Sequence, residues 1–187
     1  MNQEQRFWKD LEKITPFTSA EERAKWMIQA IEKLDRVANE EQKFEVISRC
    51  AHVRPAADID HWKEIFERNH DIDEFLSEYK DSLPFLEKPY HEGNILYTSK
   101  PPADRDAYDK ATTIQGKIKA ACFCPIIHAA LDKMSKTYCY CGAGWARQLY
   151  EGMFGESVKV DIVNTVVAGD KLCKFAVHIP DHVIKTT

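Results

Sequence analysis

The chain has no run of about 18 apolar residues, so we expect no membrane-spanning helix. Its N-terminal residues are polar and of mixed charge, without the basic and apolar regions of a signal peptide. The formal net charge is −4, which excludes the strongly basic surface typical of nucleic-acid-binding proteins. Internal repeats and low-complexity tracts are also absent. We therefore expect a cytoplasmic protein with reduced thiols and no nucleic-acid partner.

The residues that are present are those of a folded domain, and their distribution divides the chain. The 187 residues are 44% hydrophobic and 30% charged, typical of a globular protein. No glycine occurs before residue 91, whereas all seven glycines and five of the six cysteines follow it. We predict a helical region over residues 1–91 and an α+β, ligand-binding-like region over 92–187, packed together as one compact unit.

The first region reads as a series of amphipathic helices. A helix is predicted over residues 7–14, and a second begins at Ser19, which forms an S-x-x-E capping box with Glu22. That second helix carries an apolar stripe that includes Trp26 and Ile31. Asn39 and Asp71 are predicted N-caps of later helices. These helices are typical of a packed bundle or a lid and do not themselves indicate a site.

The second region predicts an antiparallel sheet covered by helices, which makes the whole chain α+β. Residues 82–115 read as a long loop with a short edge strand over 95–99. Apolar alternation predicts strands over 117–124, from 158 to about 167, and 173–179. A helix over 142–154 ends at Gly155, and Gly169-Asp170 predicts a two-residue hairpin turn.

Two C-x-C pairs are the main chemical signal. Cys122-Phe123-Cys124 and Cys139-Tyr140-Cys141 are separated by fourteen residues. In an extended chain each pair places both sulfurs on one face, because side chains alternate with a period of two. Together Cys122, Cys124, Cys139 and Cys141 could bind zinc as thiolates, with His128 and Cys173 as substitute ligands. The alternative is that these cysteines pack as small apolar residues in the core.

Cys141 also fits the pattern of a catalytic nucleophile. It lies at the predicted start of the 142–154 helix, where free backbone N–H groups lower a thiol pKa and stabilise an anion. Gly142 would let a ligand approach those groups closely. His128 is the histidine closest to the cysteine pairs in sequence and is the candidate base. The alternative is that the glycines only allow tight packing of the helix against the sheet.

A third expectation is an enclosed apolar cavity between helix and sheet. Trp145, Leu149, Val160 and Phe175 are the side chains expected to line it, together with the cysteines. The ligand-binding residues predicted on this basis are Cys122, Cys124, Cys139, Gly142, Trp145, Cys173 and Phe175. The expected partner is a small molecule, and the sequence leaves the oligomeric state open between a monomer and a homodimer.

The stretch from Cys139 to Pro180 resembles the 4-vinyl reductase domain, a predicted hydrocarbon-binding module related to TRAPP trafficking subunits. The similar features are a cysteine before a helix that begins with glycine, then V-K-V, then G-D-x-x-C-x-F. The same order resembles the L-2-amino-thiazoline-4-carboxylic acid hydrolase family, with Cys124-Pro125 upstream. The residues around the later cysteine, C-Y-C-G, depart from the hydrolase pattern. The resemblance covers about a quarter of the chain.

The two resemblances imply different functions. The first implies an α+β fold enclosing an apolar ligand, with cysteines that can hold a metal such as zinc. The second implies a hydrolase that opens a cyclic amidine-like substrate, such as a 2-amino-thiazoline carboxylate, through Cys141. We expect the ligand-binding domain first and the cysteine-dependent hydrolase as the alternative, so enzymatic activity is left undecided.

Overall fold

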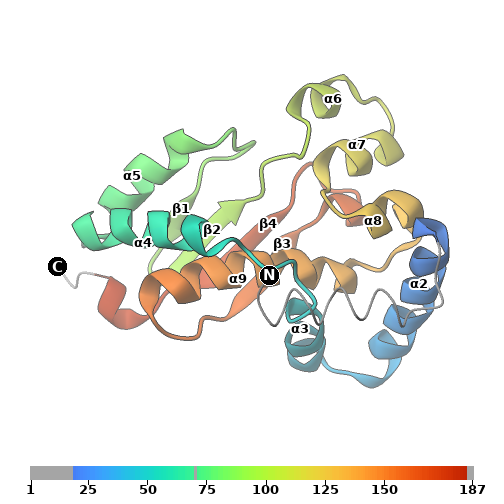
Figure 1. Ribbon diagram of the computed structural model, residues 1–187, viewed down its shortest axis with the longest axis horizontal. Helices are drawn as coiled ribbons and strands as arrows, with labels where there is room; N and C mark the ends of the chain where they lie inside the picture. The colour runs from blue at the N-terminus through green and yellow to red at the C-terminus, as the bar shows by residue number, and fades with distance from the viewer. Residues whose placement is uncertain (1–18, 70, 185–187) are drawn as a thin grey trace.

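The computed structural model describes residues 19–69 and 71–184 and has an α+β fold, as predicted (Figure 1). The helix predicted over residues 7–14 lies outside the described residues. The α-helices are α2 (Ala20–Val37), α3 (Glu40–Ser48), α4 (Ala56–Asn69), α5 (Ile72–Ser82), α6 (Arg105–Lys110), α7 (Ile114–Ala121), α8 (Pro125–Ala130) and α9 (Tyr140–Phe154). Short 3-10 helices are η1 (Leu131–Lys133), η2 (Lys136–Cys139), η3 (Val166–Ala168) and η4 (Asp181–Val183). None of the helices in the described part has the length and apolar character needed to span a bilayer.

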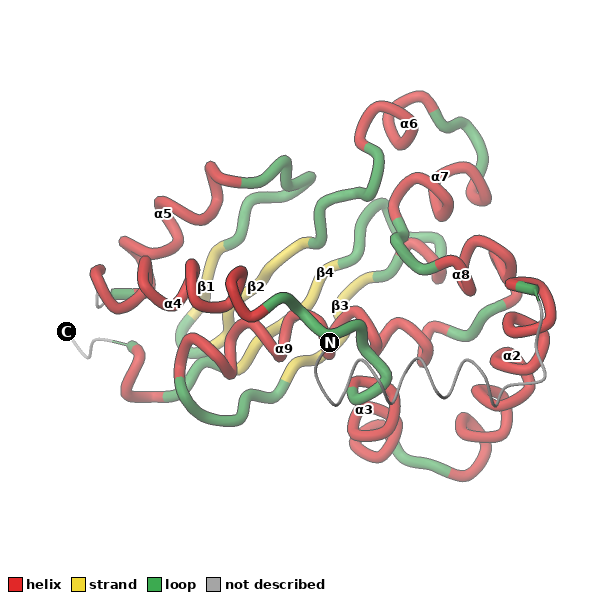
Figure 2. The backbone as a smooth tube through the Cα atoms, viewed as in Figure 1, coloured by secondary structure: helices red, strands yellow, loops and turns green. Residues whose placement is uncertain are grey.

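One antiparallel sheet of four strands forms the back of the molecule in the described part (Figure 2). Its strands are β1 (Tyr90–Glu92), β2 (Ile95–Ser99), β3 (Val160–Asn164) and β4 (Lys174–His178), in the order β1-β2-β4-β3. The strand predicted over residues 95–99 is confirmed. It is an inner strand, however, and not an edge strand, because it pairs with β1 and with β4.

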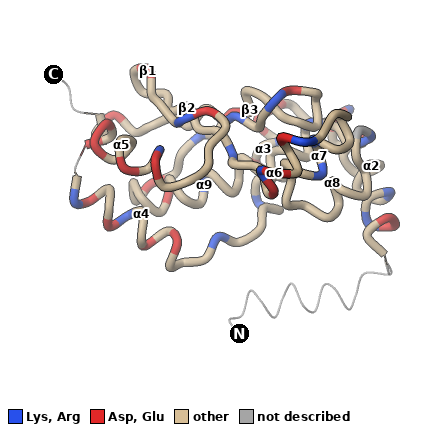
Figure 3. The backbone as a smooth tube through the Cα atoms, turned by 90° about the horizontal axis from the view of Figure 1, so that it is seen from above, with Lys and Arg blue, Asp and Glu red and all other residues tan. Residues whose placement is uncertain are grey.

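Helices cover one face of the sheet and leave the other toward solvent. Leu96, Phe175, Val177 and Val160 point to the covered face and are at most 3% exposed. Seen from above, α9 and α4 lie on the same side of the strands (Figure 3). Strand β2 alternates between accessible and buried residues from Ile95 to Thr98, as expected of a sheet with one more accessible face, whereas Ala176 of β4 is 8% exposed although it points to that face.

Helix α9 is the centre of the packing. It contacts β3 and β4 on one side and α3 and α4 on the other. Glycines make these close approaches possible, because a Cβ at Gly144 would lie 2.1 Å from the Ser48 carbonyl oxygen of α3. A Cβ at Gly152 would lie 2.3 Å from Ile59 of α4. One hydrophobic core therefore joins the helices of the first region to the sheet of the second.

The local signals of the first region predict its helices well. Ser19 forms the capping box with Glu22, and Asn39 and Asp71 cap α3 and α5. Trp26 is an exception to the predicted apolar stripe, since its side chain is 52% exposed while Ile31 of the same helix is 1% exposed.

The predicted strand over residues 117–124 is wrong, because residues 114–121 form α7. Thr113 caps this helix by accepting a hydrogen bond from the Gly116 N–H. Two alanines, two lysines and one glutamine in this segment have high helix propensity. The second region consequently lacks the predicted first strand, and β2, from within the predicted 82–115 loop, takes an inner place in the sheet. That loop also holds β1 and α6.

Two smaller boundaries also differ from the prediction. Helix α9 begins at Tyr140, two residues before the predicted start, although it ends at Gly155 in the left-handed conformation as expected. The connection between β3 and β4 is longer than a two-residue hairpin turn. It contains η3, which is capped by Thr165 and closed by Gly169 at φ +95°.

Candidate functional site

Five cysteines from separate segments lie near one another in the structure. Cys122 and Cys124 are in the extended segment between α7 and α8, Cys139 and Cys141 are at the junction of η2 and α9, and Cys173 precedes β4. The Cys139 thiol interacts electrostatically with the thiols of Cys173, Cys141 and Cys122, and the Cys141 thiol with that of Cys124. All five are free thiols, and we call them the thiol cluster.

Desolvation raises the pKa values of four thiols of the cluster. It raises the pKa of Cys141 to about 12 and that of Cys139 well above the usual value. Burial also raises the pKa values of Cys122 and Cys173. The ammonium group of Lys100 lowers the pKa of Cys122, Cys141 and Cys173, but its effect is smaller than that of burial. The thiols of Cys122, Cys139, Cys141 and Cys173 are therefore protonated near neutral pH.

The raised pKa of Cys141 is opposite to the shift expected of a nucleophile. A lowered pKa requires that the backbone N–H groups at the start of the helix have no partners. Here η2 continues directly into α9. The Tyr140 N–H therefore already has hydrogen-bond partners, since it donates to the carbonyl oxygens of Thr137 and Tyr138. The desolvation of the thiol then decides the direction of its pKa.

The predicted zinc site of Cys122, Cys124, Cys139 and Cys141 does not form in this arrangement. Among the described residues, no three His, Cys, Asp or Glu side chains are placed to hold one metal ion. The sulfurs have other partners: Cys124 Sγ lies 3.4 Å from the Tyr138 hydroxyl, and Cys122 Sγ accepts the Cys124 N–H at 3.5 Å. His128 is occupied as well, because its Nε2 lies 2.5 Å from the Cys122 carbonyl oxygen.

The residues expected to line an apolar cavity pack closely instead. A Cβ at Gly142 would lie 3.0 Å from Cζ of Phe175, so α9 and β4 are in direct contact there. Leu149 and Val160 are each 1% exposed. Trp145 is turned toward the segment before α4, where the Arg54 guanidinium lies 4.3 Å from its ring centroid. The tight-packing alternative therefore describes Gly142 correctly.

A polar cavity of about 170 Å³ lies at the start of α9 instead. Residues of α3, η2, α9, β3 and η3 surround it, and we call it the polar cleft. Its lining consists of Glu40, Lys136, Thr137, Tyr140, Ile162, Val163, Thr165, Ala168 and Asp170. One part of this lining is charged or hydroxylated, and the other part is aliphatic.

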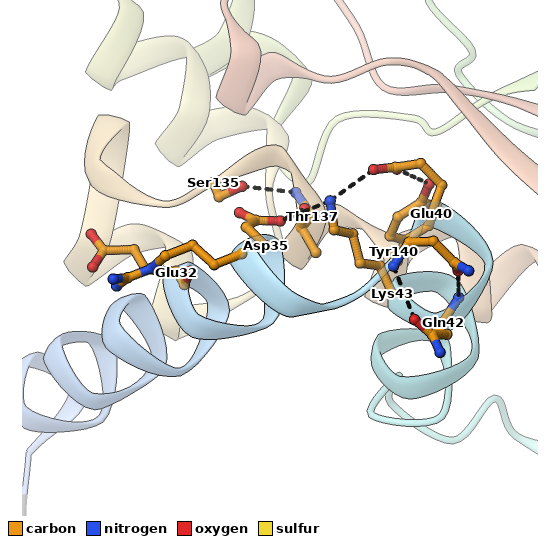
Figure 4. Close-up of polar contacts among 10 residues, drawn as sticks. Glu32, Asp35, Glu40, Gln42, Lys43, Ser135, Thr137 and Tyr140 are labelled. Carbon is orange, nitrogen blue, oxygen red and sulfur yellow. Dashed lines mark hydrogen bonds and ion pairs between the residues drawn. The ribbon is translucent and has the colours of Figure 1, made fainter.

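A hydrogen-bond network holds one wall of the polar cleft in place (Figure 4). The Tyr140 hydroxyl donates to Glu40 Oε2 at 2.9 Å, and Lys43 Nζ donates to Glu40 Oε1 at 2.8 Å. Lys43 also lies 3.4 Å from Asp35, which accepts a hydrogen bond from the Thr137 hydroxyl. Bonds with Lys43 and Tyr140 lower the pKa of Glu40, so this carboxylate is ionised and already satisfied.

The thiol cluster and the polar cleft are neighbours. The side chain of Thr165, which lines the cleft and is 1% exposed, also interacts with the Cys139 thiol and lowers its pKa. Lys100, Tyr138 and Thr165 were not among the predicted site residues. No local pattern marks them, because they come from segments far apart in sequence and meet only in the folded chain.

Comparison with known proteins gives a family without an assigned function. Residues 112–184 match DUF6144, described as a family of unknown function. The matched region contains the whole thiol cluster, η2, α9 and the last two strands. No curated protein and no solved structure matches the chain.

Proposed function

We propose that this chain is a small-molecule-binding domain whose thiol cluster contacts the apolar part of the ligand. The observation that supports this proposal is the convergence of five free thiols from three separate segments, of which Cys124 is buried and the other four are half-buried. A protonated cysteine behaves as a small, polarizable apolar residue, so such a group suits a hydrocarbon-type ligand better than an anion. Tyr138 adds an aromatic ring that is 6% exposed and in contact with Cys124.

The elements over the thiol cluster are short, which favours local opening for ligand entry. Helix α8 has six residues and η1 has three, and Leu131, where they join, has a φ of +50°. A leucine in this region of φ is strained, and such strain is often found at functional sites. Beside them Phe123 is 58% exposed, with Lys100 Nζ 4.6 Å from its ring centroid. Because the site is closed, binding requires α8 and η1 to move outward.

Binding of a naturally fluorescent fatty acid to the purified chain tests the proposal. We expect saturable fluorescence enhancement, and we expect Cys173→Phe to weaken binding about tenfold or more by filling the site. Val53→Phe is the control, because Val53 is 53% exposed and is not part of the thiol cluster. An absence of saturable binding by the wild-type chain would overturn the proposal, and so would equal affinity of the two variants when circular dichroism shows both folded.

The alternative function is a cysteine-dependent hydrolase for a cyclic amidine-like substrate. The polar cleft favours this alternative, because it places charged groups at the start of α9 close to Cys141 in sequence. The reaction would require Cys141 as a thiolate, and burial raises the pKa of this thiol to about 12. Ligand binding is therefore the better supported of the two.

Native-state labelling with iodoacetamide separates these two functions. We expect Cys50 to react first, because it is the exposed cysteine, and Cys141 to react at least about tenfold more slowly because its thiol is buried. Mass spectrometry of the digested protein measures each site. If Cys141 reacts faster than Cys50 at neutral pH, the hydrolase becomes the preferred function.

A further inference from the structure

We propose that the polar cleft is a second binding site and that it takes a small zwitterion, of the size and charge of an aliphatic α-amino acid. The inference does not depend on ligand binding at the thiol cluster, because no cysteine lines the polar cleft. The inference is based on which charged side chains of the polar cleft already have partners in the protein and which can still bind a ligand.

Most of the polar groups in the lining have protein partners. Both Glu40 oxygens accept hydrogen bonds, and the Thr137 hydroxyl is bonded to Asp35. Thr137 and Thr165 are at most 5% exposed, so the deeper wall is fixed and largely satisfied. These groups shape the polar cleft but leave little unmet charge for a ligand.

Two groups of opposite charge remain. Within residues 19–69 and 71–184, the side chain of Lys136 forms no hydrogen bond or ion pair, although it is close enough to Glu40 to lower the pKa of that carboxyl. Asp170 Oδ2 accepts the Thr165 N–H at 2.9 Å, whereas no described group bonds to Oδ1. The Lys136 ammonium can therefore bind a carboxylate of the ligand. The free Oδ1 of Asp170 can bind an ammonium of the ligand.

The rest of the lining limits the body of the ligand. Ile162, Val163 and Ala168 provide an aliphatic wall, which suits a short apolar side chain. The volume of about 170 Å³ is well below the roughly 300–1,000 Å³ of pockets for drug-sized ligands. These limits select a zwitterion with few heavy atoms over a nucleotide, a sugar phosphate or a lipid.

Titration of the isotope-labelled chain with L-alanine, followed by amide NMR, tests the site. We expect saturable shifts at Lys136–Tyr140 and Thr165–Asp170. L-Alaninamide lacks the carboxylate and propionate lacks the ammonium, so each should bind at least about tenfold more weakly, as expected for the loss of one charged hydrogen bond. An absence of saturable shifts with L-alanine would overturn the proposal, as would equal binding of propionate, which would indicate a simple anion site.

Substitutions assign the two ends of the ligand. Lys136→Met removes the ammonium and keeps the apolar stem, and Asp170→Asn keeps an acceptor for the Thr165 N–H while removing the charge. Each should weaken L-alanine binding about tenfold or more. The matched controls are Lys133→Met and Asp181→Asn, which change exposed residues outside the polar cleft. Wild-type affinity in both cleft variants contradicts the proposal, whatever the outcome of the fatty-acid experiment.

Discussion

At the scale of single residues, His91 links the first turn of α5 to the β1–β2 hairpin. Its Nδ1 lies 3.0 Å from the Gly93 carbonyl oxygen, and its Nε2 lies 3.0 Å from Asp73 Oδ1. The hydrogen bond to the Gly93 carbonyl, and then Asp73, raise the pKa of His91 above its usual value of 6.5. The folded state therefore binds this proton more tightly than the unfolded state does.

This shift predicts a pH dependence of stability. The contribution of His91 is fully present below a pH of about 6.5 and is lost as the pH rises through the higher folded-state pKa. We expect the free energy of unfolding, measured with urea, to fall over this range in the wild-type chain relative to His91→Gln. His52→Gln, at an exposed position, should keep the wild-type slope. Parallel profiles for the wild type and His91→Gln would contradict the prediction.

At the scale of elements, the glycines of α9 determine how closely other elements approach it. Gly144 faces backbone atoms of Ser48, whereas Gly142 faces the end of the Phe175 ring. Backbone cannot move aside without shifting α3, but a side chain can rotate. The same substitution should therefore have different costs at the two positions of this one helix.

We expect Gly144→Ala to lower the free energy of unfolding by about 3 kcal/mol, at the upper end of typical overpacking costs. Gly142→Ala should cost less than about 1 kcal/mol, because the higher helix propensity of alanine offsets a milder contact. Urea unfolding of both variants measures the difference. An equal loss at the two positions would show that α3 yields as readily as the Phe175 ring.

At the scale of the whole molecule, the hydrophobic core is shared by both regions. Strand β4 pairs along its whole length with β2, from Ile95↔His178 to Ser99↔Lys174. Helix α9 is covered by α3 and α4, which lie far before it in the sequence. The segment that matches a family model, residues 112–184, contains α9 and β4 but lacks β2, α3 and α4.

Residues 112–184 expressed alone should therefore not fold. The segment would expose one edge of β4 and the helix-facing side of α9, and such exposed apolar surface and unpaired strand edges destabilise a small domain. We expect poor amide dispersion by NMR for this segment, whereas residues 19–184 should give a dispersed spectrum. A cooperative thermal transition of the short segment would show that it carries a sufficient core of its own.

The sequence predicted those features that depend on near neighbours in the chain. Ser19, Asn39 and Asp71 were recognised as helix caps because a cap bonds to a backbone group two or three residues away. Gly155 was recognised because a helix end needs a left-handed residue. The alternation of Ile118, Ala120 and Cys122 predicts a strand, whereas α7 buries Ile118, Ala120 and Ala121 because it packs against α6, α8, η1 and η3.

The composition of the candidate site was only partly predictable. The sequence predicts a site at the two C-x-C pairs, and the fold brings these pairs near one another and near Cys173. The direction of the Cys141 pKa was not predictable, because it depends on burial by elements distant in sequence. The same is true of the polar cleft, whose lining runs from Glu40 to Asp170.

The sequence by itself determined the α+β class and the starts of α2, α3 and α5, because these follow from short-range periodicity and capping. Only the tertiary structure decided that β2 is an inner strand, that Gly142 packs against Phe175, and that the thiols are desolvated. The physical reason is that strand pairing, close packing and burial each depend on partners supplied from elsewhere in the chain.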